Sequence, residues 1–186
     1  MSGFADVVFN INNLTATVRM ATPIALAAMG GAFSERSGVV NIGLEGMMLA
    51  GAFCGVLGSH LTGSPWLGVA LAVAGGGLVG AILAVFAIRL KADHVVTGVG
   101  INILASGATT WLMQVIWKRK GATDMVAGLG TWSVPGLRDI PVLGTILGTH
   151  SPLVYISLIL IVLGWVLMFR TPLGLRIRMT GEHPEA

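Results

Sequence analysis

Long apolar stretches separated by short polar turns run along almost the whole chain. A bilayer core of about 30 Å needs about 20 residues of helix, so a stretch of this length is a candidate span. Five stretches qualify, at residues 14–33, 39–61, 66–90, 95–117 and 153–169. Pro65 and Pro152 stand at predicted helix starts, where the missing N–H has no intrahelical partner to lose. The pattern predicts an all-α, polytopic transmembrane helix bundle, one domain over residues 1–186.

The first stretch and the residues before it carry two further signals. Apolar residues before it follow helical spacing at Phe4, Val7, Val8, Ile11 and Leu14. This spacing predicts an interfacial segment over residues 1–13, and a frayed terminus fits equally well. Arg19 lies inside the stretch, where a charge at the bilayer centre costs about 2.5–3.5 kcal/mol. Either the Arg19 side chain snorkels toward the headgroups or the crossing begins after it.

Basic residues in the turns predict which loops face the cytoplasm. One side of the alternating topology holds Arg36, Arg89, Lys91, Arg170, Arg176 and Arg178. The other side holds Lys118, Arg119, Lys120 and Arg138. The excess is weak, and it places the turns at 34–38 and 89–93 and the C-terminal tail in the cytoplasm. The Gly- and Pro-rich segment 118–151 is then an extracytoplasmic loop.

Composition narrows the class of protein further. The chain has 186 residues, of which 54% are hydrophobic and only 10% charged, and one Cys. With a mean hydropathy of +0.85, disorder, a disulfide scaffold and a soluble enzyme are poor fits. The net charge of +3 could suggest nucleic acid, but the basic residues lie in short clusters between apolar runs. We therefore expect the lipid bilayer, and no nucleic acid, as a partner.

The sequence offers no positive sign of catalysis. The phosphate-binding pattern Gly-x-x-x-x-Gly-Lys-Ser/Thr is absent from the sequence. His60, His94, His150 and His183 are scattered near segment ends without metal-ligand spacing. No pairing of a nucleophile with a base is visible. We expect no catalytic residue, no metal and no cofactor on this chain.

The second apolar stretch contains two polar residues at its start. Asn41 and Glu45 are four residues apart, which predicts that they share one helix face. One interpretation is a helix broken or entered near Gly43 and Gly46, where the two side chains line a substrate pathway. The alternative is that both lie near the cytoplasmic headgroups and cap the helix or pair with Arg36.

The fourth stretch carries a stripe of polar residues in steps of four, at Asn102, Ser106, Thr110 and Gln114. In lipid such a stripe must face protein or water. It either lines a path for a polar solute or supplies interhelical hydrogen bonds. Elsewhere, the spacings Gly51/Gly55 and Gly76/Gly80 predict closely packed helices.

Four blocks together resemble a known family. They read ATPIALAAMGG at 21–31, SERSGVVNIGLEGMM at 34–48, KADHVVTGVGIN at 91–102, and the tail 171–186. The chain resembles the permease subunits of bacterial ABC importers, closest to the nucleoside and simple-sugar branch, which is related to the ribose and branched-chain amino acid permeases. Family members are longer, so the resemblance implies a C-terminally truncated chain.

The resemblance implies a transport subunit of the bacterial inner membrane that translocates a nucleoside or simple sugar. Implied partners are a cytoplasmic ATP-binding subunit, which would hydrolyse ATP on a separate chain, a second permease subunit and an extracytoplasmic solute-binding protein. The tail 171–186 matches the cytoplasmic coupling segment, which implies coupling roles for Gly174, Arg176, Arg178, Gly181, Glu182 and Pro184. The family pattern usually has Ala-Val where Met179 and Thr180 stand, and Asn at His183.

Alternative interpretations remain for the two arginines and for the whole chain. Arg176 and Arg178 could pair with acidic residues of the ATPase or could be ordinary cytoplasmic charge. A secondary transporter or channel would need no ATPase partner, so copurification of an ATP-binding subunit discriminates. A membrane-embedded enzyme would need an intramembrane acidic or histidine cluster, for which only Glu45 is a candidate.

Overall fold

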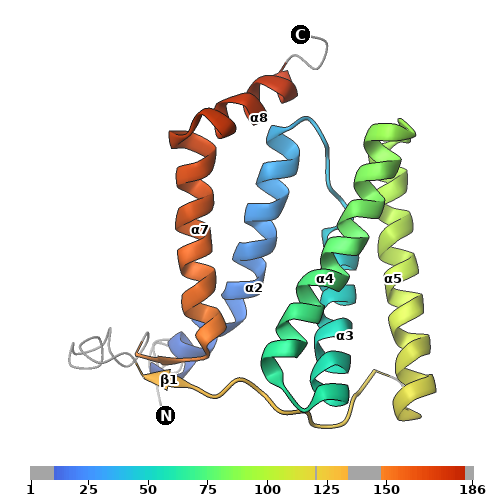
Figure 1. Ribbon diagram of the computed structural model, residues 1–186, viewed down its shortest axis with the longest axis vertical. Coiled ribbons are helices and arrows are strands. Elements are labelled where there is room, and N and C mark those ends of the chain that lie inside the picture. The colour runs from blue at the N-terminus through green and yellow to red at the C-terminus, as the bar shows by residue number, and fades with distance from the viewer. Residues whose placement is uncertain (1–10, 120, 134–147, 183–186) are drawn as a thin grey trace, which may run out of the picture. The chain divides into compact units, whose positions relative to one another are not determined.

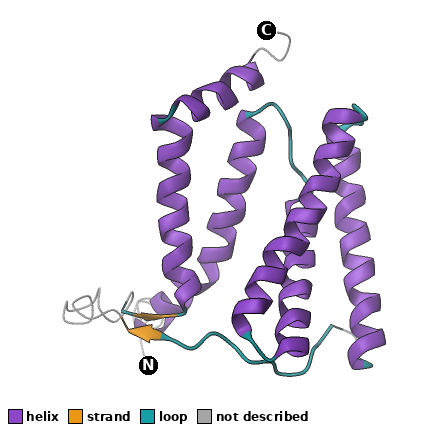
Figure 2. Cartoon of the chain, viewed as in Figure 1, coloured by secondary structure: helices purple, strands orange, loops and turns teal. Residues whose placement is uncertain are grey.

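The computed structural model describes residues 11–119, 121–133 and 148–182. Five helices within these ranges are long and apolar enough to cross a membrane (Figure 1). They are α2 (Ile11–Arg36), α3 (Leu44–Thr62), α4 (Pro65–Ala84) continued by the π-helical turn η1 (Val85–Arg89), α5 (His94–Trp117) and α7 (Pro152–Arg170). Helix α8 (Pro172–Glu182) follows α7, and β1 (Trp132–Ser133) pairs antiparallel with β2 (Thr149–His150) (Figure 2). The predicted all-α polytopic architecture is confirmed.

Four of the five predicted spans begin and end within three residues of a helix. Pro65 and Pro152 open α4 and α7 as predicted. The exception is the second span, because α3 begins at Leu44 and not at residue 39. Residues 37–43, hereafter the entry segment, lie outside the helices and form turns at residues 37–38 and 42–43, with Gly38 at a φ of 87°. Residues 1–10 of the predicted interfacial segment lie outside the described residues, and α2 begins at Ile11.

The chain divides into two compact units. The first comprises Met1–Phe33 and Leu129–Ile177, and it holds most of α2, the β-hairpin and α7. The second comprises Ser34–Gly128 and Arg178–Ala186, and it holds α3, α4, α5 and the end of α8.

In the second unit, α3 and α4 meet along a glycine seam formed by Gly51, Gly55, Gly58, Gly68 and Gly76. A Cβ placed on Gly68 would lie 2.7 Å from the Gly55 carbonyl oxygen, and one on Gly58 would lie 3.1 Å from the Gly68 Cα. The backbones therefore approach without intervening side chains, as small residues allow in membrane helices. The predicted close packing at Gly51, Gly55 and Gly76 is confirmed, whereas Gly80 makes only ordinary contact with Met47.

An N-cap and buried side-chain contacts position α5 against α3 and α4. The Asp93 carboxylate accepts a hydrogen bond of 2.9 Å from the Val96 N–H and so caps the helix start. Ile101 of α5 then packs with Leu83 and Ala87 in the buried core of the unit. At the other end of α5, buried Trp117 contacts His60 of α3, with ring centroids 5.4 Å apart.

The first unit is held together differently. A Cβ placed on Gly164 of α7 would lie 3.1 Å from the Met29 sulfur of α2 and 3.4 Å from the Phe33 ring. Gly31 is the buried residue of α2 within Ile11–Arg36. Beside the start of α7, the His150 N–H donates to the Tyr155 hydroxyl at 3.3 Å. At Gly164, α7 therefore meets α2 through the side chains of Met29 and Phe33.

Candidate functional site

The polar stripe on α5 keeps three of its four members exposed in the second unit. Ser106, Thr110 and Gln114 are exposed, and their side chains make no hydrogen bond with another described residue. Neighbouring Thr109 is buried and bonds the Ala105 carbonyl of its own helix at 2.7 Å. Interhelical hydrogen bonding therefore accounts for Asn102 alone among the four predicted residues, within the part of the chain that is described.

Asn102 makes two hydrogen bonds to the start of α3. Its Oδ1 accepts from the Gly46 N–H at 2.7 Å, and its Nδ2 donates to the Ile42 carbonyl at 3.0 Å. Gly46 lies three residues after the N-cap Gly43, which has no side chain to cap the helix. N–H groups in the first helical turn lack an intrahelical acceptor, so Asn102 supplies from α5 the cap that α3 lacks.

Glycines let α5 approach the entry segment closely enough for this bonding. A Cβ on Gly98 would lie 2.9 Å from both the Gly43 nitrogen and the Ile42 Cβ. A Cβ on Gly46 would lie 3.0 Å from the Ile101 carbonyl oxygen. No sequence pattern singles out Ile42 as a partner, because it takes part through its backbone carbonyl.

The predicted common face for Asn41 and Glu45 is wrong, because α3 begins at Leu44 and leaves Asn41 outside the helix. The Asn41 Nδ2 lies 3.5 Å from the Ser34 Oγ, and its Oδ1 is buried without a hydrogen-bond partner among the described residues. Glu45 is exposed in the first turn of α3, where a negative charge interacts favourably with the helix dipole. It forms no ion pair with Arg36 within the described chain.

Helix α8 leaves α7 through a sharp turn at Gly174. This glycine is buried, and a Cβ there would collide with the carbonyl oxygens of Leu167 and Met168. The Gly174 N–H is 3.2 Å from the Thr171 hydroxyl, which itself donates to the Leu167 carbonyl at 2.6 Å. A side chain at position 174 would therefore open the turn that sets the direction of α8.

The predicted coupling residues differ in exposure along α8. Arg176 and Glu182 are exposed, Arg178 is half-buried, and Pro184 lies outside the described residues. Gly181 packs against the turn before the entry segment, where a Cβ would collide with the Arg36 carbonyl oxygen and lie 3.0 Å from the Gly38 nitrogen. The end of α8 thus packs on the entry segment within the second unit.

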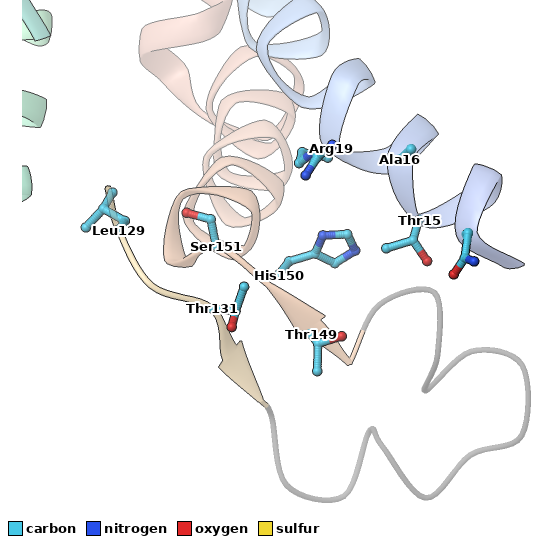
Figure 3. A pocket seen from close by; sticks show the side chains of 9 residues that line it. Thr15, Ala16, Arg19, Leu129, Thr131, Thr149, His150 and Ser151 are labelled. Atoms are coloured by element: carbon cyan, nitrogen blue, oxygen red, sulfur yellow. The ribbon is translucent and has the colours of Figure 1, made fainter. Parts of the chain in front are cut away.

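A separate polar pocket of about 370 Å³ lies within the first unit (Figure 3). It is lined by α2 and by the hairpin region, including Thr15, Arg19, Thr131 and His150. The His150 side chain extends from β2 toward α2 in this view. Arg19 therefore has polar neighbours at the hairpin end of α2, which explains how a cation is accommodated in a helix of this hydropathy.

Comparisons with known proteins show the family to which the chain belongs. The family model described as branched-chain amino acid transport system / permease component matches residues 13–186. The chain belongs to this family. Because its described residues also include five helices of sufficient length and hydropathy, it is a multi-pass membrane protein of this permease family.

Several curated relatives share most of the chain. The guanosine ABC transporter permease protein NupQ of Bacillus subtilis is 46% identical over 92% of this chain and 56% of its own length. The nucleoside ABC transporter permease protein NupC of Lactococcus lactis is 37% identical over 89% of the chain. A putative glucose ABC transporter permease protein of Haloferax volcanii is 36% identical over 92%.

The permease-family chain spans about half the length of these relatives, at 56%, 54% and 52% of each. No solved structure matches it. The four blocks that carry the family resemblance fall on α2, on the entry segment with the start of α3, on the start of α5, and on α8. Three of these blocks meet at the Asn102 and Gly181 contacts.

Proposed function

We propose that the chain belongs to the transmembrane permease subunit of an ATP-driven importer in a bacterial inner membrane. The proposed solute is a nucleoside or simple sugar. Two of the three relatives described above carry names that specify guanosine or nucleosides, which favours a nucleoside. Under this proposal ATP hydrolysis belongs to a separate ATP-binding subunit, and the residues of this chain bind and conduct solute.

The exposed polar stripe on a helix able to span the membrane carries the proposal. Ser106, Thr110 and Gln114 offer hydroxyl and amide groups along α5 that make no bond within the described chain. In hydrocarbon, such groups need a partner of their own. Ribose hydroxyls and base edges are donors and acceptors of the same kind, so the stripe suits a nucleoside path. Asn41, Glu45 and Asn102 extend this polar region to the start of α3.

Replacing Thr110 with Leu tests the solute path. In cells that express the intact transporter, we expect Thr110→Leu to lower uptake of labelled guanosine at least about tenfold, because one lost polar contact of 1.4 kcal/mol corresponds to that factor. Ala108→Leu places the same side chain two residues away at another exposed position of α5 and serves as control. Normal uptake by Thr110→Leu, at normal abundance in the membrane, would contradict a solute-lining stripe.

The proposed partners are an ATP-binding subunit at α8, a second permease subunit and an extracytoplasmic solute-binding protein. Exposed Arg176 offers a cation for an acidic surface of the ATP-binding subunit. We expect Arg176→Glu to reduce the ATP-binding subunit that copurifies in detergent, whereas Lys118→Glu, on the predicted opposite side, leaves it unchanged. Uptake in a strain that lacks any ATP-binding partner would instead favour a secondary transporter.

A further inference from the structure

The entry segment has a close contact at each of its ends, both within the second unit. At its beginning, Gly38 faces Gly181, and a Cβ on Gly38 would lie 3.3 Å from the Gly181 Cα. At its end, the Ile42 carbonyl is hydrogen-bonded to Asn102 of α5, which also bonds the Gly46 N–H in the first turn of α3. The same short stretch therefore touches the end of α8 and the first member of the polar stripe.

Backbone atoms take part in both contacts, so a movement at either one cannot be taken up by side chains alone. The turn is closed by hydrogen bonds of 3.0 Å from the Gly38 N–H to the Glu35 carbonyl and from the Val39 N–H to the Ser34 carbonyl. Gly38 and Gly181 meet through backbone atoms, which have no rotamers to adjust. At the other end, a single amide bonds two backbone groups on either side of Gly43. A shift at Gly181 would thus displace backbone at the start of α3, since closely packed atoms transmit strain.

We propose that Asn102 is a positioning residue that ties the polar stripe of α5 to the entry segment, so that movement of α8 shifts the start of α3 and α5 together. This inference rests on the proposed function, in which α8 contacts the ATP-binding subunit. Asn102 acts here through the Ile42 carbonyl and the Gly46 N–H, whichever solute the stripe binds. A capping residue on α3 itself would satisfy Gly46 equally well but would leave the two helices unlinked.

Hydrogen exchange with and without ATP tests the link in the intact transporter, reconstituted with its ATP-binding subunit. In the wild type, we expect ATP to change amide hydrogen exchange in residues 39–47, which cover most of the entry segment and the start of α3, and in residues 98–106 of α5. Asn102→Leu should raise exchange of the Gly46 amide about tenfold, since it removes the acceptor of that N–H. It should also abolish the ATP response in α5 while the response in residues 39–47 persists.

A second variant separates linking from simple capping. Adding Gly43→Ser to Asn102→Leu provides α3 with its own N-cap for the Gly46 N–H, with the Leu83 side chain moving aside. Protection of Gly46 should return, but the ATP response of α5 should not. If the leucine variant does not accumulate, Asn102→Asp retains the acceptor for the Gly46 N–H and loses the donor to the Ile42 carbonyl, so it should weaken the ATP response of α5 while Gly46 stays protected.

Glycine pairs supply matched controls. Gly38→Ala should abolish both ATP responses, whereas Gly63→Ala, at a similar positive φ of 66° and with open space around the Cβ, should preserve them. Gly98→Ala should alter the response of α5, and Gly100→Ala, again in open space, should not. An unchanged α5 response in Asn102→Leu would overturn the link alone. If the wild type bound no ATP-binding subunit and showed no ATP response, the proposed function would fail first.

Discussion

The α3–α4 pair and the α2–α7 pair are both apolar helices of bilayer-spanning length, yet they pack in opposite ways. Between α3 and α4, Gly58 and Gly68 bring the two backbones together at the glycine seam. Between α2 and α7, Gly164 faces the side chains of Met29 and Phe33. Helix α3 buries four of its residues, whereas Gly31 is the buried residue of α2.

This contrast separates a fixed part of the molecule from an adaptable one. In lipid, apolar burial does not drive helices together, so close backbone packing and hydrogen bonds must do so. The second unit has both, in the seam and in the Asn102 bonds. In the first unit, Gly164 instead meets Met29, whose flexible thioether fills gaps without fixing a geometry. The apolar faces of α2 and α7 are consequently available to lipid or to other protein helices.

The largest effect is expected from a bulky side chain in the seam. Gly68→Leu would drive a Cβ against the Gly55 carbonyl oxygen and the Ser59 backbone, neither of which can rotate away. We expect a loss of about 3 kcal/mol in the free energy of unfolding in bicelles, the upper end of typical overpacking costs. At Gly77 on the same helix a Cβ meets nothing within 4 Å, so Gly77→Leu should be nearly neutral. Equal losses in the two variants would contradict a backbone seam.

A smaller effect is expected at the hydrogen bond that joins the segment after α5 to α3. Buried Ser59 donates a hydrogen bond of 2.8 Å to the Ala127 carbonyl and so anchors the segment after α5 to α3. Ser59→Ala should cost about 1 kcal/mol, the net value of one such bond. Limited proteolysis should then cleave residues 121–128 faster. The control Thr62→Ala, which loses only local bonds to the Gly58 carbonyl of its own helix and to Ser64 in the turn after it, should leave cleavage unchanged.

The sequence was sufficient to predict the helices but not the contacts that organise them. Hydropathy located five spans, because spanning a bilayer requires about 20 apolar residues whatever their neighbours are. It misplaced the start of α3, since Val39 and Val40 are as apolar as the helix that follows. The break depends on Gly38 and Gly43 adopting turn geometry against α8 and α5, which no local pattern encodes.

The candidate site was predicted in part for the same reason. The steps of four placed Asn102, Ser106, Thr110 and Gln114 on one face of α5 correctly, because that face follows from helix geometry alone. What Asn102 does could not be predicted, because its partners are backbone groups 56 and 60 residues away. Asn41 lies in the entry segment and not in α3, so it shares no helix face with Glu45.

The smallest effect is expected at Gly164, and it decides whether the contrast between the two helix pairs holds. A methyl group there meets the Met29 sulfur at 3.1 Å and Cγ at 3.2 Å, and an unbranched side chain can move aside. Gly164→Ala should therefore change the unfolding free energy by less than about 0.5 kcal/mol. Gly58→Ala, which meets the Gly68 Cα at 3.1 Å, should cost about 1–3 kcal/mol. If the two alanine variants proved equally costly, α2 and α7 would have to be regarded as a pair as rigid as α3 and α4.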